Sequence, residues 1–355
     1  MKKVFISGGG TGGHFYPALS VAENLKEKGF SITYIGTTNG IESRKDFPAD
    51  EKILYPMKAV RGKFIIGKIQ GVFSLLSTTF KVYKQIKKEK PDFSICFGGY
   101  TSIPLGLASF LARVPLYIHE QNSIPSYSNK ILSYFAKKVF ITFEFTGKYF
   151  DRKKTVLTGM PLRKNIVERA KNYVYKPSQR KTVLVVGGSQ GAKKLSENTI
   201  SLASEMREIK FILIKGKWHV EVPNLENLTV YEYVDNMEDL YTSADVVISR
   251  SGSSSVNEIL YFGKYAIFVP FPYAASNHQY YNVKWLKDLG LCELIQEKDL
   301  SKEVLEKSLE DAFNKDLESL SKKIKEYATF DSDEKILENI LNDFKNDWTS
   351  RKYRP

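Results

Sequence analysis

The feature that most constrains this chain is a pattern that occurs twice, about half the chain apart. A short apolar strand runs into a glycine-rich loop, and a helical segment follows the loop. The first copy has a strand at 4–6 and a loop at 7–14, and the second has a strand at 182–186 and a loop at 187–192. This order begins a βαβ unit and implies a parallel sheet. The chain is therefore predicted to be α/β, with two doubly wound domains facing a central cleft.

Apolar runs with the length of buried strands support this organisation. In the first half they lie at 32–35, 94–97, 116–118 and 139–141, and in the second half at 210–214, 246–248 and 266–269. The pattern breaks near Gly159, and polar sequence continues to Lys181. At 355 residues the chain has room for two cores. We expect a first domain over 1–160, a second over 161–330, and a last helix over 331–355, with packing against the first domain as one option.

The positive charge of the chain is confined to its first part. Residues 1–160 hold 24 Lys and Arg against 11 Asp and Glu, and the remainder holds 29 of each, so the net charge of +13 belongs to the first part. Such a field favours an anionic partner, either nucleic acid or a lipid surface, although solubility alone is a third explanation. No nucleic-acid-binding motif occurs, so the prediction is no nucleic acid.

An apolar stripe within 63–90 favours the lipid surface. The residues of the stripe recur at helical spacing, and they are Ile65, Ile66, Ile69, Val72, Phe73, Leu76 and Phe80. Lysines surround the stripe. A basic rim around an apolar stripe is typical of helices that dock on anionic lipid. The alternative is an ordinary amphipathic helix that faces the core. No apolar run approaches the ~20 residues that span a bilayer, and the first residues lack a secretory signal. The two cysteines, Cys96 and Cys292, form no CxxC pair, which suits a reducing cytosol.

The two glycine loops are not those of the common nucleotide-binding motifs. The spacing of Gly8, Gly10 and Gly13 matches a dinucleotide fingerprint, but the second strand is not followed at its end by the acidic residue that binds a ribose. The second loop has Ala192 and Lys194 at positions where a Walker A motif needs glycine and a hydroxyl. An oxidoreductase is therefore disfavoured. Both loops still present backbone N–H groups at a helix start, which suits a diphosphate, unless the glycines serve only tight turns.

Short motifs along nearly the whole chain resemble, in order, those of the MurG family of peptidoglycan glycosyltransferases. They are Gly8 to His14, Arg61-Gly62-Lys63, Gly98-Gly99-Tyr100, His119-Glu120-Gln121-Asn122, Asn129-Lys130, Gly159-x-Pro161-x-Arg163, Gly187 to Ala192, Ser249 to Gly252 with Glu258, and Asn277-His278-Gln279. The chain departs from the family at Met160, where the family usually has Asn.

The resemblance implies the GT-B fold and a defined reaction. The family transfers N-acetylglucosamine, with inversion, from UDP-N-acetylglucosamine to the 4-hydroxyl of the muramyl sugar of undecaprenyl-diphosphate-linked N-acetylmuramyl-pentapeptide. It also implies a peripheral position on the cytoplasmic face of the plasma membrane, with cell-wall or division machinery as further partners. The alternatives are another GT-B enzyme that uses a UDP-sugar, such as a lipid glycosyltransferase or a UDP-N-acetylglucosamine epimerase, and a non-catalytic protein that binds a nucleotide or a membrane.

Donor binding is predicted to need neither a metal nor a cofactor, because no Asp-x-Asp pair follows an apolar strand. The negative charge of the diphosphate must then be stabilised by helix N-termini and by arginines. Arg163 and Arg250 are the candidates, unless they form surface ion pairs. The resemblance assigns the nucleotide to Arg163 and Ser189, uracil to the backbone at Val234, the ribose to Glu258, and sugar contacts to Asn122, His278 and Gln279. The first loop adds Thr11, Gly12 and Gly13. Glu258 is otherwise a glutamate favoured by a helix start.

His14 is the candidate general base, because an imidazole beside a glycine loop can titrate near neutral pH. The alternative is a hydrogen bond that only orders the loop. The acceptor set predicted with it consists of Gly13, Tyr100, His119, Glu120 and Asn129. His119 and Glu120 end a strand, where α/β sites form, although a structural role for His119 is the alternative.

Overall fold

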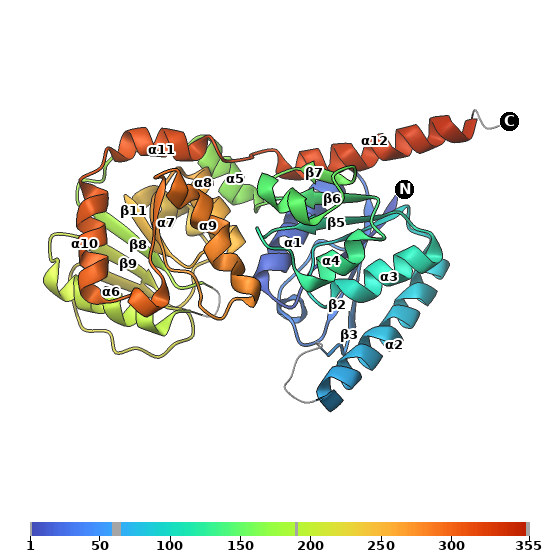
Figure 1. Cartoon of the computed structure of the whole chain (residues 1–355), viewed down its shortest axis with the longest axis horizontal. Coiled ribbons are helices and arrows are strands. Elements are labelled where there is room, and N and C mark those ends of the chain that lie inside the picture. The colour runs from blue at the N-terminus through green and yellow to red at the C-terminus, as the bar shows by residue number, and fades with distance from the viewer. Residues whose placement is uncertain (1, 59–64, 189–190, 353–355) are drawn as a thin grey trace. The chain divides into compact units, whose positions relative to one another are not determined.

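The computed structural model describes residues 2–58, 65–188 and 191–352 (Figure 1). It divides into two compact units. The N-terminal unit comprises Met1–Arg163 together with Asp331–Pro355, and the C-terminal unit comprises Lys164–Phe330. The chain therefore leaves the N-terminal unit and returns to it with its last helix, α12 (Ser332–Lys352).

The N-terminal unit is built on a parallel sheet, as predicted. Within the described residues it has seven strands in the order β3-β2-β1-β4-β5-β6-β7. Their bounds are β1 Lys3–Ser7, β2 Ser31–Thr37, β3 Glu51–Tyr55, β4 Phe93–Cys96, β5 Leu116–Glu120, β6 Lys138–Ile141 and β7 Thr155–Leu157. Val4 in β1 lies opposite Ile32 in β2 and Phe93 in β4. The strand order reverses between β1 and β4, and ligands bind at such switch points in open α/β sheets.

Alternate side chains of a strand point to opposite faces of the sheet, so each interior strand has apolar side chains on both faces. Helices cover both faces and bury these side chains. Val4 and Ile6 belong to a core that includes side chains of α1 (Gly12–Glu27) and α12, whereas Phe5 belongs to the core of α2, α3 and α4. The other bounds are α2 Ile65–Glu89, α3 Ser102–Ala112 and α4 Tyr127–Ser133, with short 3₁₀ helices η1 Ile41–Ser43 and η2 Glu144–Tyr149.

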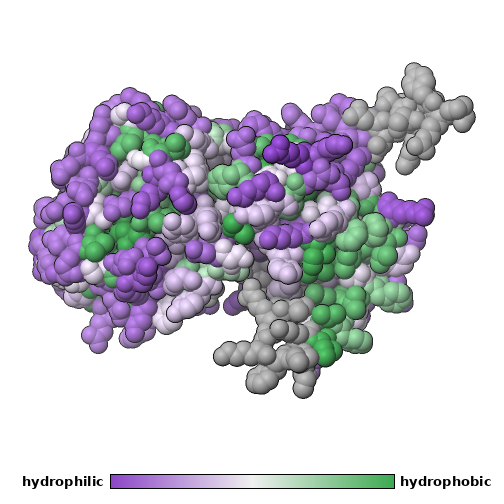
Figure 2. Space-filling model, viewed as in Figure 1, coloured by the Kyte–Doolittle hydropathy of each residue, from purple (hydrophilic) through white to green (hydrophobic). Residues whose placement is uncertain are grey.

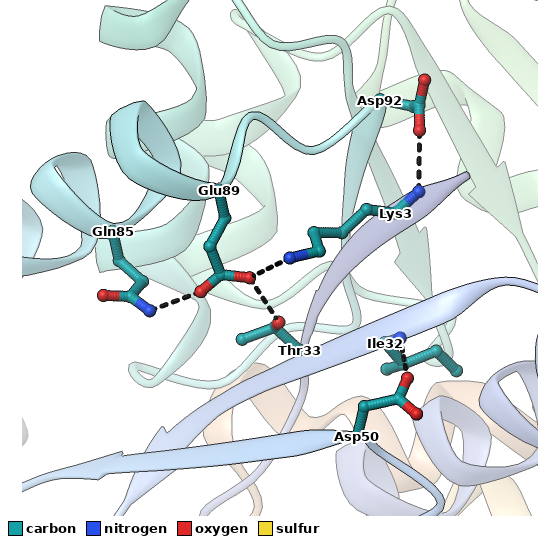
Figure 3. A network of polar contacts seen from close by, with 7 residues as sticks. All are labelled: Lys3, Ile32, Thr33, Asp50, Gln85, Glu89 and Asp92. Atoms are coloured by element: carbon teal, nitrogen blue, oxygen red, sulfur yellow. Dashed lines mark hydrogen bonds and ion pairs between the residues drawn. The ribbon is translucent and has the colours of Figure 1, made fainter. Parts of the chain in front are cut away.

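A polar network ties the end of α2 to the starts of β1 and β2 (Figure 3). One carboxylate oxygen of Glu89 pairs with the ammonium of Lys3 at 2.7 Å and accepts the hydroxyl of Thr33 at 3.1 Å. Burial raises the pKa of Glu89, but the hydrogen bonds from Lys3, Gln85 and Thr33 lower it by more. The network stabilises the end of the sheet that lies opposite the switch point, so its role is structural.

The C-terminal unit repeats the architecture with a sheet that has six parallel strands in the described residues, in the order β10-β9-β8-β11-β12-β13. Its strands are β8 Thr182–Val186, β9 Lys210–Ile214, β10 Leu228–Tyr231, β11 Val246–Ser249, β12 Tyr265–Phe268 and β13 Cys292–Leu294. Its helices are α5 Lys164–Lys171, α6 Lys193–Glu205, α7 Met237–Ser243, α8 Ser253–Tyr261, α9 His278–Asp288, α10 Lys302–Phe313 and α11 Leu317–Lys325, with η3 Ala275–Asn277 and η4 Glu297–Asp299. The switch point lies between β8 and β11.

Two further features bear on the sequence analysis. Cys96 and Cys292 are buried free thiols. Within residues 2–58, 65–188 and 191–352, no helix combines the length and the apolar character needed to cross a membrane.

Candidate active site

His14 lies in the first turn of α1, beside the glycine pair that follows β4. Gly98 and Gly99 have φ angles of +93° and +75°, which favour glycine. A Cβ atom on Gly98 would lie 3.2 Å from Cε1 and Nδ1 of the His14 ring, and one on Gly99 would lie 3.2 Å from its Cδ2. The glycine pair therefore provides both the turn and the space in which the imidazole lies.

A chain of polar contacts runs from His14 into the interior. Nδ1 of His14 lies 2.9 Å from Oε1 of Gln121, and Nε2 of Gln121 lies 3.1 Å from Nδ1 of His119. Nε2 of His119 lies 2.9 Å from the carbonyl oxygen of Gly159. Gln121 was part of the motif quoted above but was not among the predicted site residues. Its position directly after β5, at the switch-point edge of the sheet, was the available indication.

His119 is fully buried beside Phe97, with ring centroids 5.8 Å apart. Burial lowers the pKa of His119 to about 4, and the hydrogen bond to Gly159 offsets only part of that effect. The ring is therefore neutral at pH 7. This arrangement supports a structural role for His119 in place of direct contact with an acceptor.

Glu120 and Asn129 were also predicted to bind the acceptor, and both are fully buried. One carboxylate oxygen of Glu120 accepts the N–H of Asn122 at 2.9 Å, and the other accepts the N–H of Ser126 at 2.9 Å and the side-chain amide of Asn129 at 2.8 Å. That amide also donates to the carbonyl oxygen of His119 at 2.9 Å. The pair therefore holds the loop from 121 to 126 in shape, and the role that this geometry supports is positioning.

The first glycine loop is held from inside by Glu42, a buried residue of η1 that sequence reasoning missed. Its Oε2 accepts the N–H of Gly10 at 2.8 Å, and its Oε1 accepts the N–H of Thr37 at 3.0 Å. A Cβ on Gly9 or Gly40 would come within 2.3 Å of the carboxylate group, so these glycines make room for it. The N–H of Gly10 is already bonded to Glu42 and is therefore not available to a pyrophosphate.

The other predicted residues of the N-terminal unit lie around this loop. Thr11 and Gly13 are exposed, Gly12 is half-buried, and the side chain of Thr11 makes no capping hydrogen bond to α1. The ring of Tyr100 lies 3.3 Å from the place where a Cβ on Gly10 would stand. Arg163 places its guanidinium carbon 5.3 Å from the ring centroid of Tyr16, which is also on α1. The structure thus gathers this set near the start of α1.

Met160, the departure from the family pattern, is buried in the segment that follows β7. Its sulfur accepts the hydroxyl of Thr142 at 3.7 Å. A thioether is a weak acceptor, and this contact is the local change that methionine brings to the segment.

In the C-terminal unit the second loop follows β8. Ser189 lies outside the described residues. Gly188 and Gly191 have φ angles of +80° and +76°, and a Cβ on Gly191 would lie 2.3 Å from the carbonyl oxygen of Lys215. Both positions therefore require glycine, on conformational grounds and, at Gly191, on steric grounds too.

Arg250 follows β11 and is buried. Its guanidinium donates to the carbonyl oxygens of Val269 and Pro270 at 3.1 Å each, pairs with the carboxylate of Glu297, and lies 5.7 Å from the ring centroid of Phe271. These contacts hold the segment after β12 in place. A direct contact between Arg250 and a phosphate stays a prediction.

The remaining predicted donor residues lie on segments that follow strands β10, β11 and β12. Glu258 on α8 accepts the hydroxyl of Tyr241 at 3.0 Å. His278 begins α9 and contacts the carbonyl oxygen of Ala275 through Nδ1 at 2.9 Å, while Oε1 of Gln279 accepts the N–H of Phe271 at 2.9 Å. Val234 lies half-buried between β10 and α7.

The described part of the chain contains no group of three or more His, Cys, Asp or Glu side chains that could hold a metal ion.

Two doubly wound parallel units, each with a glycine loop at its switch point, define a protein of the GT-B fold class. Residues 4–141 match the glycosyltransferase family 28 N-terminal domain, and residues 182–338 match the glycosyltransferase family 28 C-terminal domain. The chain belongs to glycosyltransferase family 28.

Relatives of known name agree with this assignment. The chain is 94% identical over 347 residues to the UDP-N-acetylglucosamine--N-acetylmuramyl-(pentapeptide) pyrophosphoryl-undecaprenol N-acetylglucosamine transferase of Sulfurihydrogenibium sp. (strain YO3AOP1), covering 98% of this chain and 100% of the relative. It is 36% identical to the enzyme of the same name from Aquifex aeolicus (strain VF5), covering 95% and 99%. The crystal structure of Acinetobacter baumannii MurG superposes with a TM-score of 0.77 at 29% identity, covering 96% and 100%.

Proposed function

We propose that this chain transfers N-acetylglucosamine from UDP-N-acetylglucosamine to the 4-hydroxyl of the muramyl sugar of undecaprenyl-diphosphate-linked N-acetylmuramyl-pentapeptide, in peptidoglycan synthesis. The observation that carries the proposal is the 94% identity, over 98% of the chain, to a transferase named for this reaction. At that identity a change of substrate class would need substitutions concentrated in the site.

The acceptor and the nucleoside of the donor are assigned to different units, while Arg163 and Asn122 of the N-terminal unit are assigned to the donor diphosphate and sugar. We assign the acceptor and the general base His14 to the N-terminal unit. We assign the uridine, ribose and sugar of the donor to the C-terminal unit through Val234, Glu258, His278 and Gln279. A base on one unit and a nucleotide site on the other give a group transfer between two bound molecules.

The reaction is one displacement that inverts the anomeric carbon. His14 takes the proton of the acceptor hydroxyl while its oxygen attacks the anomeric carbon, and the bond from that carbon to the UDP oxygen breaks. The leaving diphosphate gains negative charge, which backbone N–H groups at helix starts and Arg163 stabilise. UDP-N-acetylglucosamine is a substrate here, and the proposal includes no cofactor.

The two alternatives from the sequence are less well supported. An epimerase would change the donor sugar and needs no lipid acceptor, whereas the relatives named above are transferases. A binding protein without activity would not need the glycine pair at 98–99 to make room for an imidazole.

Incubation of the full chain with labelled UDP-N-acetylglucosamine and a synthetic lipid-diphosphate N-acetylmuramyl-pentapeptide tests the proposal. We expect label in the extracted lipid, in a β linkage, and none when the acceptor lacks its 4-hydroxyl. Conversion of the donor to another UDP-sugar, or a product with retained configuration, would overturn the proposal.

The position of the enzyme at a membrane is a second part of the proposal, carried by α2. One side of α2 is buried through Leu75, Val82 and Ile86, as an ordinary amphipathic helix requires. A separate apolar stripe is exposed, and we call it the α2 stripe: Ile69, Val72, Phe73, Leu76 and Phe80. Phe73 exposes 74% of its surface. The core therefore accounts for one face of α2 and leaves the α2 stripe unexplained.

The surroundings of the α2 stripe suit an anionic lipid surface. Exposed lysines follow it on the same helix, at Lys81, Lys84, Lys87 and Lys88. Helix α3, which packs against α2, exposes Phe110 and Leu111. Figure 2 shows apolar residues gathered over α2 and α3. Exposed apolar side chains next to lysines bind the boundary between lipid headgroups and acyl chains. We therefore place the chain on the cytoplasmic face of the plasma membrane, where the lipid-linked acceptor is held.

A further inference from the structure

We infer that Gln121 and His119 are positioning residues that fix the tautomer of His14, with a proton on Nδ1 and a lone pair on Nε2. The geometry gives this assignment without reference to a substrate. Its catalytic meaning rests on the proposed function, because Nε2 would then be the atom that takes the acceptor proton. The inference is built in three steps, from the buried end of the chain of contacts toward His14.

The first step assigns the protons of His119. Nε2 of His119 faces the carbonyl oxygen of Gly159 at 2.9 Å, and a carbonyl oxygen can only accept. Nε2 therefore carries a proton. Because the ring is fully buried and neutral, Nδ1 has no proton and acts as an acceptor.

The second step orients the amide of Gln121. Its nitrogen lies 3.1 Å from the unprotonated Nδ1 of His119 and 3.1 Å from the carbonyl oxygen of the same residue. Both partners are acceptors, so the NH₂ group must face them. The reversed amide would place its oxygen against two acceptors, and that orientation is excluded on electrostatic grounds.

The third step assigns His14. The amide oxygen of Gln121 is directed at Nδ1 of His14 at 2.9 Å, and it can only accept. Nδ1 of His14 therefore donates, and in a neutral imidazole the other nitrogen holds the lone pair. Turning the ring over would place Cδ2 opposite the amide oxygen of Gln121 and lose this hydrogen bond.

The titratable groups around His14 leave this assignment unchanged. His119 lies behind Gln121. The carboxylates of Glu42 and Glu120 are directed at backbone N–H groups, with the Asn129 amide also on Glu120, and Tyr100 lies over Gly10. Gln121 is thus the contact through which the interior acts on Nδ1 of His14.

Nitrogen NMR of the histidine rings tests the inference on the full chain without substrate. The chain has four histidines, so replacing His14 and His119 one at a time assigns their signals. At pH 8.5, above the ordinary range of a histidine pKa, we expect a protonated Nδ1 in His14 and a protonated Nε2 in His119. A protonated Nε2 in wild-type His14 would overturn the inference.

Two variants of Gln121 separate positioning from mere packing. Gln121→Leu removes the acceptor, so we expect part of the His14 population to carry its proton on Nε2 in place of Nδ1. Gln121→Glu keeps an acceptor for His14, so we expect the proton on Nδ1 of His14 to be retained. Its second carboxylate oxygen would replace the NH₂ group that faces His119, so we also expect Nδ1 of His119 to gain a proton. Gln296→Leu, an exposed control in the C-terminal unit, should change nothing. An unchanged tautomer in Gln121→Leu would contradict the inference, and the wild-type spectrum decides if that variant does not fold.

Activity gives a second readout. We expect Gln121→Leu to lower kcat by about 10- to 100-fold with little change in KM, less than the ~10⁴-fold loss that a wrong tautomer causes in a serine protease. The two proposals fail separately. If the chain makes the lipid product but His14 has the other tautomer, only the inference about Gln121 and His119 is wrong. If His14 has the expected tautomer but the chain has no transfer activity, only the proposed function is wrong.

Discussion

The carboxylate of Glu42 accepts the backbone N–H of Gly10 at 2.8 Å and that of Thr37 at 3.0 Å. One buried side chain thereby joins the first glycine loop to the end of β2. The loop leads directly into the turn that carries His14, so the shape of this turn depends on the buried side chain of Glu42. In a dinucleotide-binding protein, an acidic residue in this region would bind a ribose instead.

Replacing this carboxylate tests its structural role. Glu42→Gln should destabilise the N-terminal unit by about 1–3 kcal/mol, because the amide would present its own N–H group to one of two buried N–H donors. Urea unfolding measures the loss, and UDP affinity should be unchanged. The matched control is Glu51→Gln on the exposed part of β3. Equal stability of the two variants would contradict the role given to Glu42.

His14 is expected to be needed for chemistry and not for donor binding. His14→Ala should lower kcat by ~10²–10⁴-fold, the range for a lost acid–base group. Calorimetry should find the affinity for UDP unchanged, because the residues assigned to uracil and the ribose, Val234 and Glu258, belong to the C-terminal unit. His219→Ala, at an exposed position, serves as the control. Near-wild-type turnover of His14→Ala would remove this residue from the mechanism.

The buried His119 predicts a pH dependence of stability. Burial lowers the pKa of its folded form to about 4, below the ordinary value near 6.5. The unfolded chain then binds more protons between these values, so stability is fully present above about pH 6.5 and is lost as the pH falls toward 4. The contribution is on the order of 3 kcal/mol.

Hydrogen exchange of the β5 amides during urea unfolding, from pH 8 to pH 4.5, measures this contribution. The difference in free energy of unfolding between wild type and His119→Asn should become smaller as the pH falls. His219→Asn should have the same free energy of unfolding as wild type at every pH. A difference between wild type and His119→Asn that does not vary with pH would show that the ring is not the titrating group.

Glu258 is expected to bind the ribose of the donor. Glu258→Gln removes a charged acceptor and should weaken UDP binding by about 10- to 100-fold, the equivalent of 1.5–3 kcal/mol. Tyr241→Phe, which removes only the hydroxyl bonded to that carboxylate, should weaken it less. Calorimetry with UDP compares the two variants, and wild-type affinity in Glu258→Gln would exclude the assignment.

The α2 stripe is expected to bind vesicles that contain anionic lipid. A Phe73→Ser, Leu76→Ser variant should bind them at least ~10-fold more weakly, because each apolar side chain contributes about 1.5–3 kcal/mol when buried. Its affinity for UDP should not change. Val174→Ser, Tyr273→Ser is the control at exposed positions of the C-terminal unit. Sedimentation that is independent of anionic lipid and of salt would argue against docking.

The interior of both sheets could be predicted from the sequence, and their edges could not. The predicted strands correspond to β1, β2, β4, β5 and β6 in one unit and to β8, β9, β11 and β12 in the other. The strands that were missed are β3, β7, β10 and β13, which are the edge strands of the two sheets. Interior strands are buried on both faces and read as continuous apolar runs. Edge strands are short or contain polar residues, as Glu51–Tyr55 does at Glu51 and Lys52, and therefore resemble loops.

The candidate site shows a similar division. Residues in motifs, such as His14 and the glycine pair at 98–99, could be identified because chemistry or backbone conformation restricts them locally. The role of Gln121 depends on two acceptors that the fold supplies, and the role of Glu42 depends on glycines at 9, 36 and 40 that only the folded chain brings around it. Such contacts form across distant segments, so local patterns do not reveal them.

Helix α12 belongs to the N-terminal unit, although the whole C-terminal unit precedes it in the chain. Its residues Ile336, Leu337 and Ile340 complete a core that begins at Val4. On the ribosome, the C-terminal unit therefore has its full sequence before the N-terminal unit can close this core. We expect the first half of the newly made chain to stay incompletely packed, and open to chaperones, until the part of α12 that carries these residues emerges.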